Sequence, residues 1–281
     1  MEFFKLAIPS DEGMNPELHC YIPANYDGIE PNRKRPAVIV CPGGAYRGCS
    51  DREAECIALQ YLAADMAAFI LYYSAGLEKA RFPRCTLEAL SAIKIVRENS
   101  EKWNIHPQKI AILGFSAGGH LAGSAGAFWN TDLAKEHFDD QKLCKPNAAV
   151  LCYPVITGGK FAHLGSMHSL FGYNVTQEQR DSVSLEKFVT KEYPPTFLWH
   201  TAADKGVPVQ NSLLMATALA NNHIPFEYHV YPTGKHGLGL SDERSAEVIN
   251  GVPNPELLEI RPRRWVQDSI SFLKDIAFKN K

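Results

Sequence analysis

A serine between glycines, in the stretch GFSAG (114–118), is the residue best placed for covalent chemistry. Ser116 follows a run of apolar residues and precedes a stretch of small ones, so we predict a turn from a buried strand into a helix. In such a turn Gly114 and Gly118 have no Cβ to clash with neighbouring backbone, which lets the serine hydroxyl project from the end of the strand. The pattern predicts a nucleophilic serine; the structural alternative is a glycine-rich helix start that packs closely against a sheet.

A serine hydroxyl is a weak nucleophile, so it needs a base that an acidic side chain orients. Asp204 lies in the loop after the strand-like run TFLWHT, and His236 lies in the loop after FEYHVY. The chain order of serine, acid and histidine is the order found with this kind of serine turn. We therefore predict that Ser116 is the nucleophile, His236 its base and Asp204 the orienting acid.

Other acids and histidines are weaker candidates because of where they fall in the sequence. The alternative acids precede the serine, lie in an irregular segment or follow the histidine: Asp65, Asp181, Asp242 and Glu243. The alternative histidines fall within expected strands or helices or at a helix end: His120, His200, His223 and His229. Of these, His120 lies one turn into the helix after the serine, and we expect it to support packing or a hydrogen bond.

Acyl transfer also needs backbone N–H groups that stabilise the oxyanion of a tetrahedral intermediate. The residue after the nucleophile, Ala117, supplies one such group, and a loop after an early strand supplies the others. The stretch CPGGAYRG (41–48) follows an apolar run, and Gly43 and Gly44 allow its backbone to turn N–H groups inward. We predict that this loop forms the oxyanion hole; a plain Pro-Gly-Gly turn is the alternative.

The sequence around these residues alternates apolar strand-like runs with helical stretches. The expected strands lie within 36–44, 66–74, 109–116, 147–156, 195–204 and 225–237, and the last two stretches also contain the loop that follows each strand. The expected helices are 51–65, 85–103, 117–128, 207–222 and 263–278. This alternation predicts an α/β protein with a mostly parallel sheet and helices on both faces, and the Pro-rich start of the chain predicts an antiparallel edge. We expect one domain, 1–281, with a short cap inserted at about 157–194.

Composition narrows the class of protein. Lys and Arg number 29 and Asp and Glu number 31, and no basic stripe is present, which argues against nucleic acid or an anionic membrane as a partner. No apolar run approaches the ~20 residues of a membrane span, and the start of the chain has no signal-peptide pattern. Seven cysteines without CxxC spacing favour free thiols in a reducing compartment. We expect a soluble cytoplasmic protein without a metal or cofactor.

Four stretches together resemble the α/β-hydrolase superfamily: VIVCPGGAYRG, NIHPQKIAILGFSAGGHLAG, PPTFLWHTAADKGVPVQNSLLMATAL and FEYHVYPTGKHGLGL. Within it, the chain is most similar to compact bacterial esterases of the acetyl xylan esterase or sugar-ester hydrolase type, related to the HGGG-type carboxylesterases. The resemblance implies an α/β-hydrolase fold over roughly 35–275 and the same triad. It also implies that the N–H groups of Gly44, Ala45 and Ala117 form the oxyanion hole. Pro42 stands where many relatives have histidine, and Ala45 where they have a third glycine.

The predicted function is hydrolysis of short acyl esters through an acyl-enzyme, with an acetylated sugar or xylo-oligosaccharide as the small-molecule substrate. We expect Tyr46 and Arg47 to contact the alcohol portion of the ester, and Tyr153 to wall the acyl pocket. One alternative is a peptidase or amidase of the oligopeptidase type, although such enzymes usually carry a large extra domain. The other is a binding protein on the same fold, which predicts a broken triad.

Overall fold

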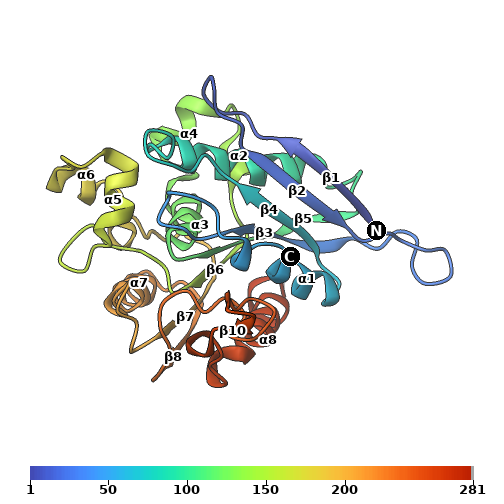
Figure 1. Cartoon of the computed structure of the whole chain (residues 1–281). Coiled ribbons are helices and arrows are strands. Elements are labelled where there is room, and N and C mark those ends of the chain that lie inside the picture. The colour runs from blue at the N-terminus through green and yellow to red at the C-terminus, as the bar shows by residue number, and fades with distance from the viewer. Residues whose placement is uncertain (280–281) are drawn as a thin grey trace.

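Eight strands form one central sheet in the computed structural model, which describes residues 1–279 (Figure 1). In chain order the strands are β1 (Glu2–Ala7), β2 (Glu17–Ile22), β3 (Arg35–Cys41), β4 (Ala67–Tyr72), β5 (Ile105–Phe115), β6 (Ala148–Cys152), β7 (Thr196–Thr201) and β8 (Phe226–Tyr231). Their order across the sheet is β1-β2-β4-β3-β5-β6-β7-β8. Strands β3 to β8 pair in parallel with one another, whereas β1 and β2 are antiparallel. The predicted mostly parallel sheet and its antiparallel edge are therefore confirmed.

Helices cover both faces of the sheet, which gives the molecule three layers (Figure 1). The helices on one face are α2 (Arg84–Glu98), α3 (Ala117–Phe128) and α7 (Gln210–Asn221). Those on the other face are α1 (Glu55–Ala63) and α8 (Trp265–Phe272). Successive β3 residues alternate between the two cores, because Ile39 packs in the first and Val38 and Val40 pack in the second. Burial on both faces is the reason that the central strands read as unbroken apolar runs.

Shorter elements connect these layers. The short helices are α4 (Asp132–His137), α5 (Leu164–Phe171) and α6 (Gln177–Asp181), and a small hairpin is formed by β9 (Val248–Ile249) and β10 (Val252–Pro253). The 3₁₀ turns are η1 (Asp51–Glu53), η2 (Gln141–Cys144), η3 (Leu185–Lys187), η4 (Pro255–Leu257) and η5 (Arg261–Arg264), and η6 (Leu273–Ala277) is a π-helical turn. The segment expected as a cap, 157–194, contains α5, α6 and η3 between β6 and β7.

Buried hydrogen bonds fasten the segment 157–194 to α3 and α7. His120 in α3 donates from Nε2 to the carbonyl oxygen of Val183 (2.9 Å). Asn211 in α7 donates to the carbonyl oxygen of Phe161 (3.0 Å), and its own Oδ1 accepts the N–H of Thr157 (3.1 Å). Because His120 and Asn211 are fully buried, water does not compete for these bonds. The segment is therefore part of the packed body of the protein.

Two expected helices differ from those observed. Helix α2 ends at Glu98 rather than at 103; residues 99–104 form hydrogen-bonded turns, and β5 begins at Ile105, earlier than expected. The expected closing helix 263–278 is divided into η5, α8 and η6. The last two residues of the expected domain, 280–281, lie outside the described part of the chain.

Strands β3, β5, β7 and β8 are parallel, so their carboxyl ends open onto the same edge of the sheet. The loops that leave these four ends carry the residues predicted to do chemistry. Among the helices of residues 1–279, none is long and apolar enough to cross a bilayer.

Candidate active site

Ser116 lies in a sharp turn between β5 and α3. Its backbone has φ 53° and ψ −117°, a conformation that costs of order 1–3 kcal/mol for a residue other than glycine. Two glycines make the turn possible. A Cβ on Gly114 would lie 2.0 Å from the carbonyl oxygen of Gly118, and a Cβ on Gly118 would lie 2.1 Å from that of Cys41. The strand–turn–helix geometry expected around the serine is therefore present.

The structure brings Ser116, His236 and Asp204 into one hydrogen-bonded chain. Ser116 Oγ is 2.7 Å from His236 Nε2, and His236 Nδ1 is 2.6 Å from Asp204 Oδ2. Because a carboxylate only accepts, His236 donates from Nδ1, which leaves Nε2 free to accept the serine proton. The three side chains come from the loops after β5, β7 and β8. This arrangement is chemically able to activate the serine hydroxyl.

Asp204 is held as a carboxylate by donors on both of its oxygens. Its Oδ1 accepts the N–H groups of Gly206 (2.8 Å) and Val207 (2.9 Å), and its Oδ2 accepts from His236. Burial alone would raise the pKa of Asp204, but the bonds from His200 and His236 outweigh it and hold the pKa well below the ordinary value. His200 Nε2 lies 3.3 Å from Oδ2. Sequence reasoning gave His200 only a structural place inside β7 and missed this contact.

The loop after β3 has the backbone shape of an oxyanion hole. Gly44, Ala45 and Tyr46 all have positive φ (133°, 55° and 60°). Among the described residues, the N–H groups of Gly44 and Ala45 have no hydrogen-bond partner, and Ala117 begins α3, where backbone N–H groups lack partners within the helix. The N–H of Gly43 is already used by a buried glutamate, Glu53 (2.9 Å). Gly43 therefore shapes the loop and has no N–H to offer an oxyanion.

Tyr46 does not reach the site surface, contrary to our expectation that it contacts substrate. Its left-handed backbone turns the side chain inward, where it is fully buried. The hydroxyl of Tyr46 lies 2.8 Å from Nδ1 of His120, whose Nε2 donates to Val183. His120 thus makes the supporting hydrogen bonds expected of it. Tyr46 links the oxyanion loop to α3 and, through His120, to the segment 157–194.

Tyr153 is also buried, contrary to our expectation that it walls an acyl pocket. It follows β6 with φ 35°, and its ring packs edge-on under His236 at 5.1 Å between centroids. The hydroxyl donates to Glu53 Oε1 (2.6 Å) and accepts the N–H of Gly239 (2.9 Å). Tyr153 therefore supports the loop that carries His236 and Gly239. No feature of its sequence neighbourhood indicated that direction.

The side chains of Arg47 and His163 lie close to each other, and His163 lies near His236. The side chain of Arg47 is exposed and has no hydrogen bond or ion pair among the described residues. His163, from the segment 157–194, was not singled out from the sequence; its Nδ1 accepts the N–H of Ser166 (3.2 Å), so its proton is on Nε2. A Cβ on Gly165 would lie 3.2 Å from the ring of His163 and 3.5 Å from the guanidinium of Arg47, so both groups converge on Gly165.

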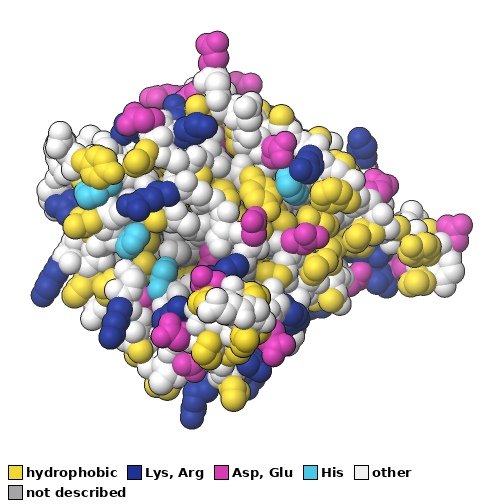
Figure 2. Space-filling view, viewed as in Figure 1, with side chains coloured by type: hydrophobic (Ala, Val, Ile, Leu, Met, Phe, Trp, Pro, Cys, Tyr) yellow, Lys and Arg dark blue, Asp and Glu magenta, His cyan; other side chains and the backbone are white. Residues whose placement is uncertain are grey.

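The surroundings of His163 favour its neutral form. Burial lowers the pKa of His163, and the nearby charges of His236 and Arg47 lower it further. Figure 2 shows histidine side chains close together on the face that carries α5 and α7. His163 therefore offers a neutral N–H donor, and Arg47 a positively charged guanidinium, close to the triad.

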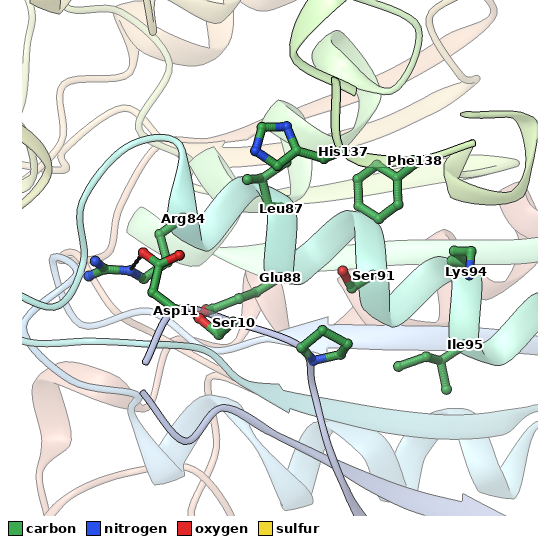
Figure 3. A pocket seen from close by; sticks show the side chains of 11 residues that line it. Ser10, Asp11, Arg84, Leu87, Glu88, Ser91, Lys94, Ile95, His137 and Phe138 are labelled. Atoms are coloured by element: carbon green, nitrogen blue, oxygen red, sulfur yellow. Dashed lines mark hydrogen bonds and ion pairs between the residues drawn. The ribbon is translucent and has the colours of Figure 1, made fainter. Parts of the chain in front are cut away.

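A partly open cavity lies away from these residues (Figure 3). It measures about 360 Å³ and is walled by α2, the end of α4 and the N-terminal segment, with Glu88 and Phe138 among its residues. The serine there, Ser10, donates to Glu88 rather than to a histidine. The shape of this cavity is therefore a weaker indicator of the active site than the geometry around Ser116. Within residues 1–279, no cluster of three or more His, Cys, Asp or Glu side chains suits a metal ion.

Comparison with known families agrees with this geometry. The BD-FAE family model matches residues 19–219, well over half of the chain. The chain belongs to the BD-FAE family. The match includes Ser116 and Asp204 and ends before His236.

Solved and curated proteins support the same assignment. An acetyl ester-xyloside bifunctional hydrolase from Caldicellulosiruptor lactoaceticus matches with a TM-score of 0.81 and 36% identity, over 95% of this chain and 90% of that one. The chain has the α/β-hydrolase fold, so the resemblance noted from the sequence is confirmed.

Two curated relatives are longer than this chain. Endo-1,4-beta-xylanase B of Butyrivibrio fibrisolvens is 37% identical over 82% of the chain and 36% of its own length. An acetylxylan esterase of Xylanibacter ruminicola is 26% identical over 82% of the chain and 45% of its own length. The chain therefore spans less than half the length of either relative.

Proposed function

We propose that this chain is a serine ester hydrolase that removes short acyl groups, acetyl above all, from a sugar or xylo-oligosaccharide. The observation that carries the proposal is the hydrogen-bonded chain from Ser116 Oγ through His236 to Asp204. Support for a sugar ester comes from the relatives, one named an acetylxylan esterase and another an acetyl ester-xyloside hydrolase. We propose no metal or cofactor, because hydrolysis through a serine acyl-enzyme requires neither.

The proposed reaction has two matched halves. His236 Nε2 takes the proton of Ser116 as Oγ attacks the ester carbonyl carbon, and the N–H groups of Gly44, Ala45 and Ala117 stabilise the oxygen that becomes negative. His236 then gives its proton to the leaving alcohol oxygen as the ester C–O bond breaks, which leaves an acyl group on Ser116. Water repeats the sequence with the same proton transfers and releases the carboxylic acid.

We propose that Arg47 and His163 bind the alcohol portion of the ester. Both are hydrogen-bond donors next to His236, and the leaving alcohol departs toward His236 in the proposed reaction. Sugar hydroxyl and ring oxygens are acceptors that suit these donors. We propose short acyl groups because the names of the acetylxylan esterase and the acetyl ester-xyloside hydrolase refer to acetyl esters.

The test compares wild type with Ser116→Ala on p-nitrophenyl esters of increasing acyl length and on acetylated xylo-oligosaccharides. We expect the wild type to prefer acetyl, and Ser116→Ala to lose activity by at least about 10³-fold because the nucleophile is gone. Ser124→Ala is the matched control, since Ser124 is a buried serine of the same helix whose hydroxyl has no partner among the described residues.

Three outcomes decide the proposal. Equal turnover by wild type and Ser116→Ala would place the chemistry elsewhere. Faster cleavage of aminoacyl p-nitroanilides than of acetyl esters would favour a peptidase. Failure of a fluorophosphonate probe to label Ser116 in the folded protein would favour a binding role on this fold.

A further inference from the structure

A buried glutamate stands behind the oxyanion loop and takes no part in the proposed chemistry. Glu53 belongs to the 3₁₀ turn η1 and is 3% exposed. One carboxylate oxygen accepts the N–H of Gly43 (2.9 Å) and the other accepts the O–H of Tyr153 (2.6 Å). No basic side chain among the described residues pairs with Glu53. A buried carboxylate without a cation is costly unless hydrogen bonds satisfy it, so these two bonds matter to the local structure.

On one side Glu53 fixes the oxyanion loop. A Cβ on Gly43 would lie 2.5 Å from Glu53 Oε2 and 3.2 Å from Cβ of Ser116, so Gly43 fills the narrow space between the glutamate and the nucleophile. The carbonyl oxygen of Gly43 accepts the N–H of Ser50, just before η1 (2.9 Å). Both polar groups of Gly43 are thus held by η1 and the residue before it. Among the described residues, the N–H groups of Gly44 and Ala45 that follow have no hydrogen-bond partner.

On the other side, η1 fixes the loop that carries His236. Tyr153, which donates to Glu53, also accepts the N–H of Gly239 and packs its ring against His236. Arg52, next to Glu53, donates from Nη2 to the carbonyl oxygen of Gly237 (2.7 Å). Burial, followed by the nearby Glu53, keeps the pKa of Tyr153 well above its ordinary value, so its hydroxyl stays a donor.

We infer that η1 is a shared anchor, in which Glu53, helped by Tyr153 and Arg52, sets the position of the oxyanion loop relative to His236. Hydrogen bonds run from Gly43 through Glu53 and Tyr153 to Gly239, so a change at either end is transmitted to the other. None of the anchoring groups touches the reacting atoms, so they are positioning residues. The inference rests on the proposed function, because it concerns the distance between the two groups that the reaction uses.

The test changes the anchor by two conservative substitutions, Glu53→Gln and Tyr153→Phe. In Glu53→Gln the amide has a single acceptor oxygen, so either Gly43 or Tyr153 loses its acceptor. In Tyr153→Phe the ring stays but both bonds of the hydroxyl disappear. With p-nitrophenyl acetate we expect each variant to lower kcat by about 10- to 100-fold, with KM changed by less than about 2-fold, because the oxyanion donors act mainly in the transition state. The double variant should lose no more than the worse single one, since the two residues act as a unit.

Two matched controls separate positioning from simple loss of stability. Glu88→Gln alters another buried carboxylate, which accepts the N–H of Ser74 (2.8 Å) next to the cavity of Figure 3. Tyr61→Phe removes another buried tyrosine hydroxyl, which bonds Ser269 (2.7 Å). We expect both controls to unfold at lower urea concentration while keeping the wild-type kcat. All variants are assayed at a temperature at which circular dichroism shows them folded.

The outcomes separate this inference from the proposed function. If Glu53→Gln and Tyr153→Phe keep kcat within about 2-fold of their controls while wild type shows Ser116-dependent turnover, the anchor role is wrong and the function stands. If Glu53→Gln does not fold, Tyr153→Phe decides alone, because it removes only one oxygen. A wild type without Ser116-dependent turnover overturns the proposed function and the anchor role with it.

Discussion

At the scale of single residues, the surroundings of Asp204 leave no place for a side-chain amide. Gly206 and Val207 donate to one oxygen, and His236 donates to the other, near His200 Nε2. An asparagine offers one acceptor oxygen and one NH₂ group, so either orientation sets the NH₂ against donors. The site therefore requires the charged form of Asp204.

We predict that Asp204→Asn lowers kcat for p-nitrophenyl acetate by about 10³- to 10⁴-fold, because His236 can no longer hold its proton on Nδ1. Steady-state kinetics with purified protein measures the effect. Asp242→Asn is the control, since Asp242 forms its ion pair with Arg244 on the surface and should keep wild-type activity. Comparable activity in both variants would remove Asp204 from the proposed triad.

At the scale of elements, the first turn of α3 is pressed against the loop after β3. A Cβ on Gly118 would lie 2.1 Å from the carbonyl oxygen of Cys41 and 2.4 Å from that of Pro42. Both obstacles are backbone atoms, which cannot move away as a flexible side chain would. The contact places Ala117 N–H next to the oxyanion loop.

We predict that Gly118→Ala destabilises the protein by about 3 kcal/mol or more and that any folded fraction is nearly inactive, because α3 must move away from the loop. Urea unfolding followed by circular dichroism measures the loss. Gly28→Ala is the control, since a Cβ on Gly28 meets nothing within 4 Å. A Gly118→Ala protein as stable and active as Gly28→Ala would contradict the close approach.

At the scale of the whole molecule, His120 joins three parts of the chain that are far apart in sequence. It accepts from Tyr46 in the oxyanion loop, lies in α3, and donates to Val183 in the segment 157–194. Burial lowers the pKa of His120 to about 4, although its bond to Val183 opposes the shift. The ring is therefore neutral in the folded protein where an unfolded histidine, with a pKa near 6.5, would already bind a proton.

Stability should consequently fall as the pH drops from about 6.5 toward 4, because the unfolded chain takes up a proton there that the folded chain does not. At pH 4.5 this one group costs about 2 kcal/mol relative to pH 7. We predict that urea unfolding of wild type shows this loss and that His120→Gln, though less stable at pH 7, shows a smaller one. An identical pH dependence in the two proteins would assign the acid sensitivity to other groups.

The sequence was sufficient to predict most of the fold and to predict that Ser116, Asp204 and His236 lie together. Parallel strands buried on both faces read as apolar runs, and residues just after such runs must meet at one edge, which is how Ser116, Asp204 and His236 could be found together. Side-chain direction in the loops could not be found this way. The left-handed backbones of Tyr46 and Tyr153 turn both rings inward, and no periodic pattern records that.

Contacts between distant loops were also beyond sequence reasoning. Glu53 looks like one of many charged residues before a helix, and only the folded chain shows its carboxylate buried against Gly43 and Tyr153. His163 lies in a segment with no periodicity, so nothing marked it as a neighbour of Arg47. The end of α2 was placed too late because the apolar Trp103 continues the helical spacing, although the chain leaves the helix at Asn99.

The buried hydrogen bonds that join the segment 157–194 to α3 and α7 affect how substrate enters the site at Ser116 and how product leaves it. Hydrogen bonds hold this segment at Val183, Phe161 and Thr157. A movement of the whole segment would break these buried polar contacts, which water does not replace. The width of the opening above Ser116 is thus established when the protein folds. We therefore expect substrate to reach Ser116, and product to leave it, without a movement of the whole segment 157–194.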